Sequence, residues 1–125
     1  LPLGINTNTA AVMGVTIGNH LPKAVGADVV DQSGREHLGS IEFPIPILKG
    51  SKERLKDLRT RLYEDAFSDL KVVDFSDTAQ SCKTYDEYIG KIADVAEPEL
   101  SYFGIAICGD KKKVNKLTGS LPLLR

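Results

Sequence analysis

The chain has 125 residues, of which 42% are hydrophobic and 26% charged, as is ordinary for one globular domain. Its formal net charge is -1, so no global field draws it to nucleic acid or to an anionic membrane. No apolar run approaches the roughly 20 residues that span a bilayer, and we therefore treat residues 1–125 as a single domain with no membrane partner.

The first predicted element is a helix over residues 6–18, NTNTAAVMGVTIG, with apolar side chains on all sides. Such a helix has no polar face to turn to water, so we expect it to be buried. Asn6 or Thr7 can supply the side-chain oxygen that caps its first turn. Because a buried first helix normally follows a strand, we also expect a strand just before Leu1.

A hairpin is predicted next. Residues 25–30 and 41–48 predict its two strands, and the turn-forming residues DQSG at 31–34 lie between them. Pro44 and Pro46 both lack the backbone N–H that would face the same neighbouring strand. We therefore expect an edge strand here, or pairing that ends where the prolines begin.

Beyond the hairpin the chain alternates predicted helices and strands. The 3-4-4 spacing of Leu55, Leu58, Leu62 and Ala66 predicts an amphipathic helix after the N-cap Ser51. Thr84 with Glu87 forms the capping box of another helix. The run LSYFGIAIC is typical of a central strand covered on both faces. The predicted elements are a helix over 51–66, a strand over 70–75, a helix over 84–96, a strand over 100–108 and a helix over 111–118 capped by Asp110. This order predicts an α/β fold with three α/β/α layers around a small mixed β-sheet.

Four segments, LPLGINTNTAAV, FPIPILK, VVDFSDTAQ and VNKLTGSLPLLR, resemble an uncharacterised bacterial protein family that is thought to share the fold of type II peptidyl-tRNA hydrolases. The last segment also resembles the Thr-Gly-x-Leu-x-Leu-Leu signature that closes those hydrolases, here Thr118, Gly119, Leu121, Leu123 and Leu124. The resemblance implies a type II peptidyl-tRNA hydrolase-like scaffold whose first strand precedes Leu1. It also implies that the closing leucines are buried against the domain.

The resemblance retains Asp74 and Thr78 as candidate catalytic residues. The alternative is structural, because an Asp at a strand end commonly binds loop amides and a Thr can close a turn. The lysine and glutamine of the hydrolases fall on Thr7 and Ala11, which bring neither the charge nor the hydrogen bond that ester cleavage needs. Asn8 is a polar residue in an apolar helix, so we expect it to hydrogen-bond a buried group in the cleft of Asp74.

Three successive lysines begin the last predicted helix, where cations are disfavoured by about 0.3–1 kcal/mol each. One interpretation is an anion site formed by lysines and free helix amides. The other is a solvated charge run offset by Asp110. The residues predicted to bind a ligand are Thr7, Asn8, Lys111, Lys112, Lys113 and Thr118.

Two cysteines, Cys82 and Cys108, lack a C-x-x-C spacing, which is typical of a reducing compartment and predicts a cytoplasmic protein. Cys82 precedes a predicted helix, yet no histidine stands near it in sequence to act as a base, so we expect an unreactive thiol. His20 and His37 have no other ligand at metal-binding spacing, so we predict no metal and no cofactor.

Three functional hypotheses follow. The first is a protein that binds a small anionic or nucleotide-like ligand on a hydrolase-like scaffold. The second is a peptidyl-tRNA hydrolase, with RNA as its partner. The third is an interaction module that forms a homodimer through the region of Pro44 and Pro46.

Overall fold

The computed structural model describes residues 1–125, and its centre is an antiparallel pair of strands, β3 (Lys71–Ser76) and β4 (Tyr102–Cys108). Asp74 stands opposite Ile105, and directly opposed residues of an antiparallel pair point to the same face. Both strands were predicted to within two residues at each end. The sheet is antiparallel where a mixed sheet was expected, because a parallel pair needs a further strand beside β3 or β4.

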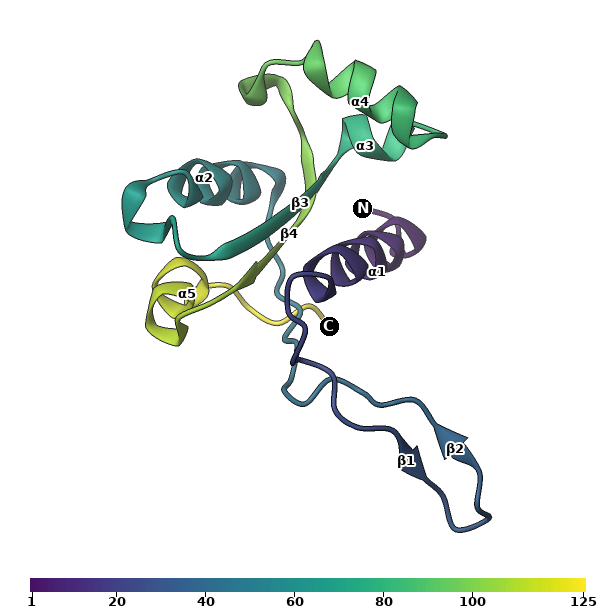
Figure 1. Cartoon of the computed structure of the whole chain (residues 1–125). Coiled ribbons are helices and arrows are strands. Elements are labelled where there is room, and N and C mark those ends of the chain that lie inside the picture. Colours follow the sequence, from purple (N-terminus) through teal and green to yellow (C-terminus); the bar gives the residue numbers. More distant parts are fainter.

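Helices cover both faces of this sheet, which confirms the three predicted layers. α1 (Leu3–Gly18) lies on one face, and α2 (Lys52–Leu62) and α5 (Lys111–Thr118) lie on the other (Figure 1). Burial of a large apolar side chain contributes about 1.5–3 kcal/mol. The main buried cluster lies under α2 and α5 and consists of Leu62, Phe67, Leu70 and Leu117.

Shorter elements connect these layers. A 3-10 turn, η1 (Asp65–Phe67), follows α2, and another, η2 (Glu97–Glu99), leads into β4. Between the strands lie α3 (Asp77–Ser81), which was not predicted, and α4 (Tyr85–Ala93), which was. α3 has only five residues, too few to show the apolar periodicity by which longer helices are recognised.

Three predicted N-caps are confirmed. Ser51, Thr84 and Asp110 each accept a hydrogen bond from the backbone amide three residues further on, at 3.1 to 3.2 Å. Such a cap is worth about 0.5–2 kcal/mol. Ser76 caps α3 in the same way at 3.4 Å. These caps fix where each helix begins, and α5 agrees with its predicted bounds at both ends.

The start of α1 was predicted wrongly. The helix begins at Leu3, directly after Pro2, and no side chain caps it. Asn6 and Thr7 lie inside the helix, and the Thr7 hydroxyl donates to the Leu3 carbonyl at 2.6 Å. Proline fixes a backbone angle that suits the beginning of a helix, so the turn can start without a polar cap.

The expected complete burial of α1 is also wrong. Thr9 is the one residue of the helix that is fully buried, whereas Leu3 and Val15 are 82% and 79% exposed. The buried side of the helix lies close against the sheet at Gly104. A Cβ at this position would lie 2.7 Å from Cγ2 of Thr9 and 2.8 Å from Cε of Met13, so a glycine is what permits this approach.

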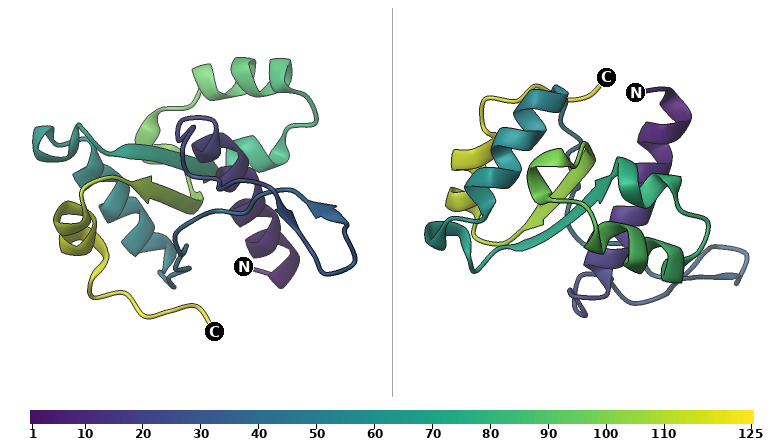
Figure 2. Two further views of the ribbon diagram at one scale, coloured as in Figure 1. Left: turned by 60° about the horizontal axis from the view of Figure 1, so that its bottom comes forward. Right: turned by 90° about the horizontal axis from the view of Figure 1, so that it is seen from above.

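The hairpin stands away from the rest of the chain (Figures 1 and 2). Its strands are β1 (Val29–Val30) and β2 (Glu36–His37), and a bridge between Val25 and Ile41 extends their pairing. We call residues 25–47 the arm. The predicted hairpin is confirmed, but its second strand lies earlier than the predicted 41–48.

The prolines explain this difference. Residues 43–46 form no backbone hydrogen bond with a neighbouring segment, and Pro44 and Pro46 lie in that gap. Since proline has no N–H to donate, a ladder cannot pass through them. The sequence left two alternatives open here, and the structure supports the one in which pairing ends at the prolines.

Pairing resumes with the last residues of the chain, which we call the C-terminal segment (residues 120–125). The amide of Lys49 donates to the carbonyl of Pro122 and that of Leu124 to the carbonyl of Ile47, both at 2.8 Å. Leu121 is half-buried, while Leu123 and Leu124 are 49% and 42% exposed. The predicted burial of all three leucines is therefore wrong, and backbone pairing holds the segment in place.

Replacing Gly104 with alanine tests the contact between α1 and the sheet. The added methyl group overlaps Thr9 and the tip of Met13, and such overpacking typically costs about 1–3 kcal/mol. We expect urea denaturation to show this loss for Gly104→Ala. Gly90→Ala in α4 is the control, because no atom lies within 4 Å of its added carbon; alanine should stabilise that helix by about 0.5–1 kcal/mol. Equal stability of the two variants would contradict the close approach.

The turn of the arm predicts a dependence on pH. Oδ2 of Asp31 lies 2.8 Å from Nε2 of His37, and Oδ1 accepts from the amides of Ser33 and Arg35 at 2.8 and 3.1 Å. The hydrogen bond with His37, followed by the backbone hydrogen bonds, lowers the pKa of Asp31 below its ordinary value. The carboxylate therefore stabilises the turn above its unfolded pKa, and this contribution is lost as pH falls through the lowered folded value.

We expect the protection factors of the Ser33 and Arg35 amides, which compare exchange with that of an unstructured peptide at the same pH, to fall at acidic pH in the wild type. In Asp31→Asn the protection factors should be low at every pH, because the charged acceptor is gone. Glu36→Gln removes an exposed carboxylate from the same hairpin and should leave the profile unchanged. Protection that does not respond to pH in the wild type would rule out this role for Asp31.

Candidate functional site

Asp74, a predicted catalytic residue, lies in an ion pair beneath α2. Nε of Arg59 donates to its Oδ2 at 2.9 Å, and the two side chains are only 14% and 26% exposed. The guanidinium carbon of Arg59 also lies 4.1 Å from the ring centre of Tyr63, a cation–π distance. The carboxylate of Asp74 is thus held by a charge and partly removed from water, which fits a role in fixing α2 to the sheet.

Two tyrosines near this pair stay protonated at neutral pH. The hydroxyl of the buried Tyr102 donates to Oε1 of Glu97 at 3.2 Å, and burial, followed by the charge of Glu97, raises its pKa above the ordinary value. Burial, followed by the negative charge of Asp74, raises the pKa of Tyr88 as well. Both groups are therefore hydrogen-bond donors at neutral pH and not bases.

Thr78, the second predicted catalytic residue, lies in α3, directly after β3. Its backbone carbonyl accepts from the hydroxyl of Ser81 at 2.8 Å and from the thiol of Cys82 at 3.2 Å. The loop amides that we expected Asp74 to bind are bound by Asp77, whose Oδ1 accepts from the amides of Thr78 and Ser101 at 2.9 and 3.1 Å. An aspartate at this end of β3 does bind loop amides, as the structural alternative expected, but that aspartate is Asp77 and not Asp74.

Thr7 and Asn8 lie on the opposite side of the central sheet from the side chain of Asp74. Both belong to α1 and are exposed, whereas Asp74 points to the opposite face of the sheet, toward α2. Asn8 was expected to bond a buried group, and that expectation is wrong. Its neighbour Thr9 occupies the buried position, 3% exposed, and its hydroxyl has no hydrogen-bond partner.

The three lysines lie at the end of the sheet opposite to Thr78, since they follow the last residue of β4, which pairs with the first residue of β3. Nζ of Lys113 is 2.9 Å from Oδ1 of Asp69, and this hydrogen bond lowers the pKa of Asp69. Lys111 and Lys112 are exposed. The Thr118 hydroxyl donates to the carbonyl of Val114 at 2.9 Å within α5. The structure therefore does not bring the predicted ligand-binding residues together.

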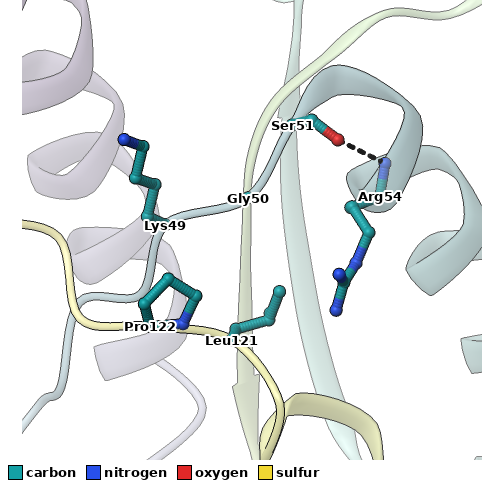
Figure 3. A pocket seen from close by; sticks show the side chains of 6 residues that line it. All are labelled: Lys49, Gly50, Ser51, Arg54, Leu121 and Pro122. Carbon is teal, nitrogen blue, oxygen red and sulfur yellow. Dashed lines mark hydrogen bonds between the residues drawn. The ribbon is translucent and has the colours of Figure 1, made fainter.

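Two adjoining hollows lie instead between α2, α5 and the C-terminal segment. The first has a volume of about 380 Å³ and is lined by Lys49, Gly50, Ser51, Arg54, Leu121 and Pro122 (Figure 3). The second has a volume of about 150 Å³ and is lined by Arg54, Asp57, Leu58, Arg61, Lys116, Leu117, Ser120 and Leu121. Arg54 and Leu121 belong to both. In Figure 3 the side chain of Arg54 extends toward Leu121.

The charge around these hollows is positive. Lys49, Arg54, Arg61 and Lys116 line them, and none of these four cations forms an ion pair with a carboxylate. The guanidinium of Arg54 donates to the hydroxyl of Ser120 at 3.0 Å. We call these four residues the basic cluster. Asp57 is the one acidic residue in either lining, so the cluster is a local excess of positive charge on a chain of net charge -1.

Sequence reasoning missed this cluster because half of it depends on a contact between distant segments. The charged face of α2 could be read from the sequence, as could Lys116. The return of the C-terminal segment to Lys49, which closes the hollow, follows from backbone pairing that no local pattern reveals.

Comparison with known protein families gives a match over the whole chain. Residues 1–125 match the family model described as "Protein of unknown function (DUF2000)". The chain belongs to this family. The expected membership of an uncharacterised family is thereby confirmed.

The DUF2000 chain also resembles a solved structure, that of a protein of unknown function from Agrobacterium tumefaciens. The match has a TM-score of 0.88 and 17% sequence identity, and it covers 100% of this chain and 90% of that one. At this identity the likeness shows a shared fold. No curated protein matches the chain in sequence.

Two further observations concern ligands and membranes. No group of three or more His, Cys, Asp or Glu side chains is arranged to share a metal ion. None of the helices combines the length and the apolar content needed to cross a bilayer.

Cys82 and Cys108 are both free thiols, each half-buried.

The pair of Arg59 and Asp74 predicts a measurable coupling energy. Asp74→Asn leaves the half-buried guanidinium without its opposite charge, which we expect to cost about 1–3 kcal/mol in urea denaturation. In a double-mutant cycle, Arg59→Gln and Asp74→Asn should couple by about 0.5–3 kcal/mol. Asp86→Asn, an exposed carboxylate on α4, is the control and should cost less than about 0.5 kcal/mol. A coupling energy near zero would show that the pair does not hold α2.

Proposed function

We propose that this DUF2000 protein binds a small anionic ligand that carries phosphate groups, at the basic cluster between α2, α5 and the C-terminal segment. The observation that supports this most directly is the set of four cations around two adjoining hollows, none of them neutralised by a carboxylate. Uncompensated positive charge in a concave site favours an anion.

The chemistry of the lining fits phosphate. Arginine presents a planar fork of donors that matches phosphate oxygens, and lysine adds a mobile point charge. α2 begins at the first hollow, so the positive end of its dipole adds to the field of Lys49 and Arg54. A volume of about 380 Å³ lies in the range of small-molecule sites.

The proposed ligand is of the class predicted from the sequence, a small anion, but the proposed site is the basic cluster and not the start of α5. Lys111, Lys112 and Lys113 were expected to bind the anion, but Asp69 already engages Lys113, and neither Lys111 nor Lys112 lines either of the two hollows. The free thiols of Cys82 and Cys108 support our further proposal that the protein works in the cytoplasm.

Hydrolysis of peptidyl-tRNA on a type II peptidyl-tRNA hydrolase-like scaffold is the alternative proposal, and Asp74 and Thr78 are what supports it. Against it, Asp74 is paired with Arg59, and no hydrogen bond joins the side chains of Asp74 and Thr78. Thr7, at the position of the hydrolase lysine, lies on the other face of the sheet. The geometry therefore favours binding over ester cleavage.

A second role, self-association as a homodimer, is favoured by a different observation. The chain exposes 9147 Å² of surface, whereas the scaling for folded monomers gives about 6,600 Å² at a mass of 13.6 kDa. The excess supports a partner that covers part of the chain.

Titration with inorganic pyrophosphate, followed by amide NMR, tests the proposed anion site. We expect chemical shifts to move at residues 49–54 and 116–121. Lys49→Gln combined with Lys116→Gln removes two of the four charges and should weaken binding by about tenfold or more. Lys111→Gln combined with Lys112→Gln removes the same charge elsewhere and should leave the affinity unchanged. Shifts confined to residues 111–113, or an equal loss in both double variants, would contradict the assignment.

A further inference from the structure

The uncovered surface of this chain is concentrated in two neighbouring elements. Only 8 of 125 residues are buried, and the excess over an ordinary monomer of this mass is about 2,500 Å². Obligate homodimers bury about 1,000–2,500 Å² on each partner. The excess is therefore of the size that a second copy covers, and the inference below rests on the proposed self-association.

The arm carries eight of the 17 large apolar side chains that the chain exposes, more than any other element. Figure 1 shows β1 and β2 projecting away from the helices and from the central sheet. A solvated hairpin would normally turn an apolar face to its own domain. The large apolar residues of the arm, between 36% and 87% exposed, are Val25, Val29, Val30, Leu38, Ile41, Phe43, Ile45 and Ile47.

The outer side of α1 adds to this surface. Its 16 residues include no charged side chain, although a helix facing water usually carries charges on that side. Leu3, Val12 and Val15 are 82%, 39% and 79% exposed. Because the arm follows α1 after a short turn, the two surfaces are neighbours along the chain.

We propose that the arm and the outer side of α1 pack against the same surfaces of a second copy of this chain, related by two-fold symmetry. An isologous contact of this kind brings each arm against the partner and covers both patches at once. The net charge of -1 means that two copies repel each other little. Pro44 and Pro46 interrupt the ladder of the arm, which favours a closed pair over an open row of strands.

Sedimentation equilibrium on the full chain tests the proposal, with an expected mass of twice 13.6 kDa at about 10 µM protein. Val30→Lys combined with Phe43→Lys places charges on the arm, and Val15→Lys places one on α1. We expect each to raise the dissociation constant of the dimer by about 100-fold or more. Tyr85→Lys combined with Ile89→Lys is the control, since these apolar residues of α4 are as exposed and lie outside the proposed face.

Each outcome has a distinct meaning. A wild type that stays monomeric at 100-fold higher concentration overturns both the self-association and this face, and would leave a further segment of polypeptide or a different protein as the cover. A dimer broken by the α4 variants but not by those of the arm or α1 overturns the face alone. Circular dichroism and pyrophosphate titration of every variant separate loss of pairing from unfolding; if the arm variant unfolds, Val15→Lys decides the question.

Discussion

The burial of Leu117 beneath α2 is the contact on which much of this structure depends. It joins Leu62, Phe67 and Leu70 in the one substantial apolar cluster, and through it α5 is fixed against both α2 and the sheet. Once α5 is fixed, the C-terminal segment leaves it at Gly119 and reaches the strand-like residues 47–49, where two backbone hydrogen bonds hold it. The C-terminal segment, held in this way, forms one side of the larger hollow at the basic cluster through Leu121 and Pro122.

Local signals in the sequence were sufficient to predict the ends of those helices whose capping residues lie directly beside them. α5 could be predicted at both ends because Asp110 caps it and Gly119 ends it. The starts of α2 and α4 could be predicted for the same reason, since Ser51 and Thr84 cap them. The start of α1 could not be predicted, since Pro2 begins that helix without a side-chain cap. The apolar pattern of α1 predicted burial, but ten of its 16 residues are exposed. An apolar pattern shows which residues would gain from being covered, and not whether anything covers them.

The sequence predicted the class of ligand, an anion, but not the residues that form the candidate site. Asp74 is singled out by its place in a strand, but its partner Arg59 is fifteen residues earlier on another element, and no spacing rule links them. The lysines of α5 are conspicuous in the sequence, yet Asp69 engages one of them across the turn into β3. The cations that remain without carboxylates, Lys49, Arg54, Arg61 and Lys116, come from three segments whose meeting depends on tertiary contacts.

The hydrogen bonds around Asp31 have a consequence for the thermodynamics of association. They hold the tip of the arm in one conformation through two backbone amides and the ring of His37. A preformed arm has already lost the conformational freedom that a flexible loop would give up on contact. In the dimer that we propose, entropy therefore opposes docking of the arm less, and a larger share of the apolar contact made by the arm is expressed as binding affinity.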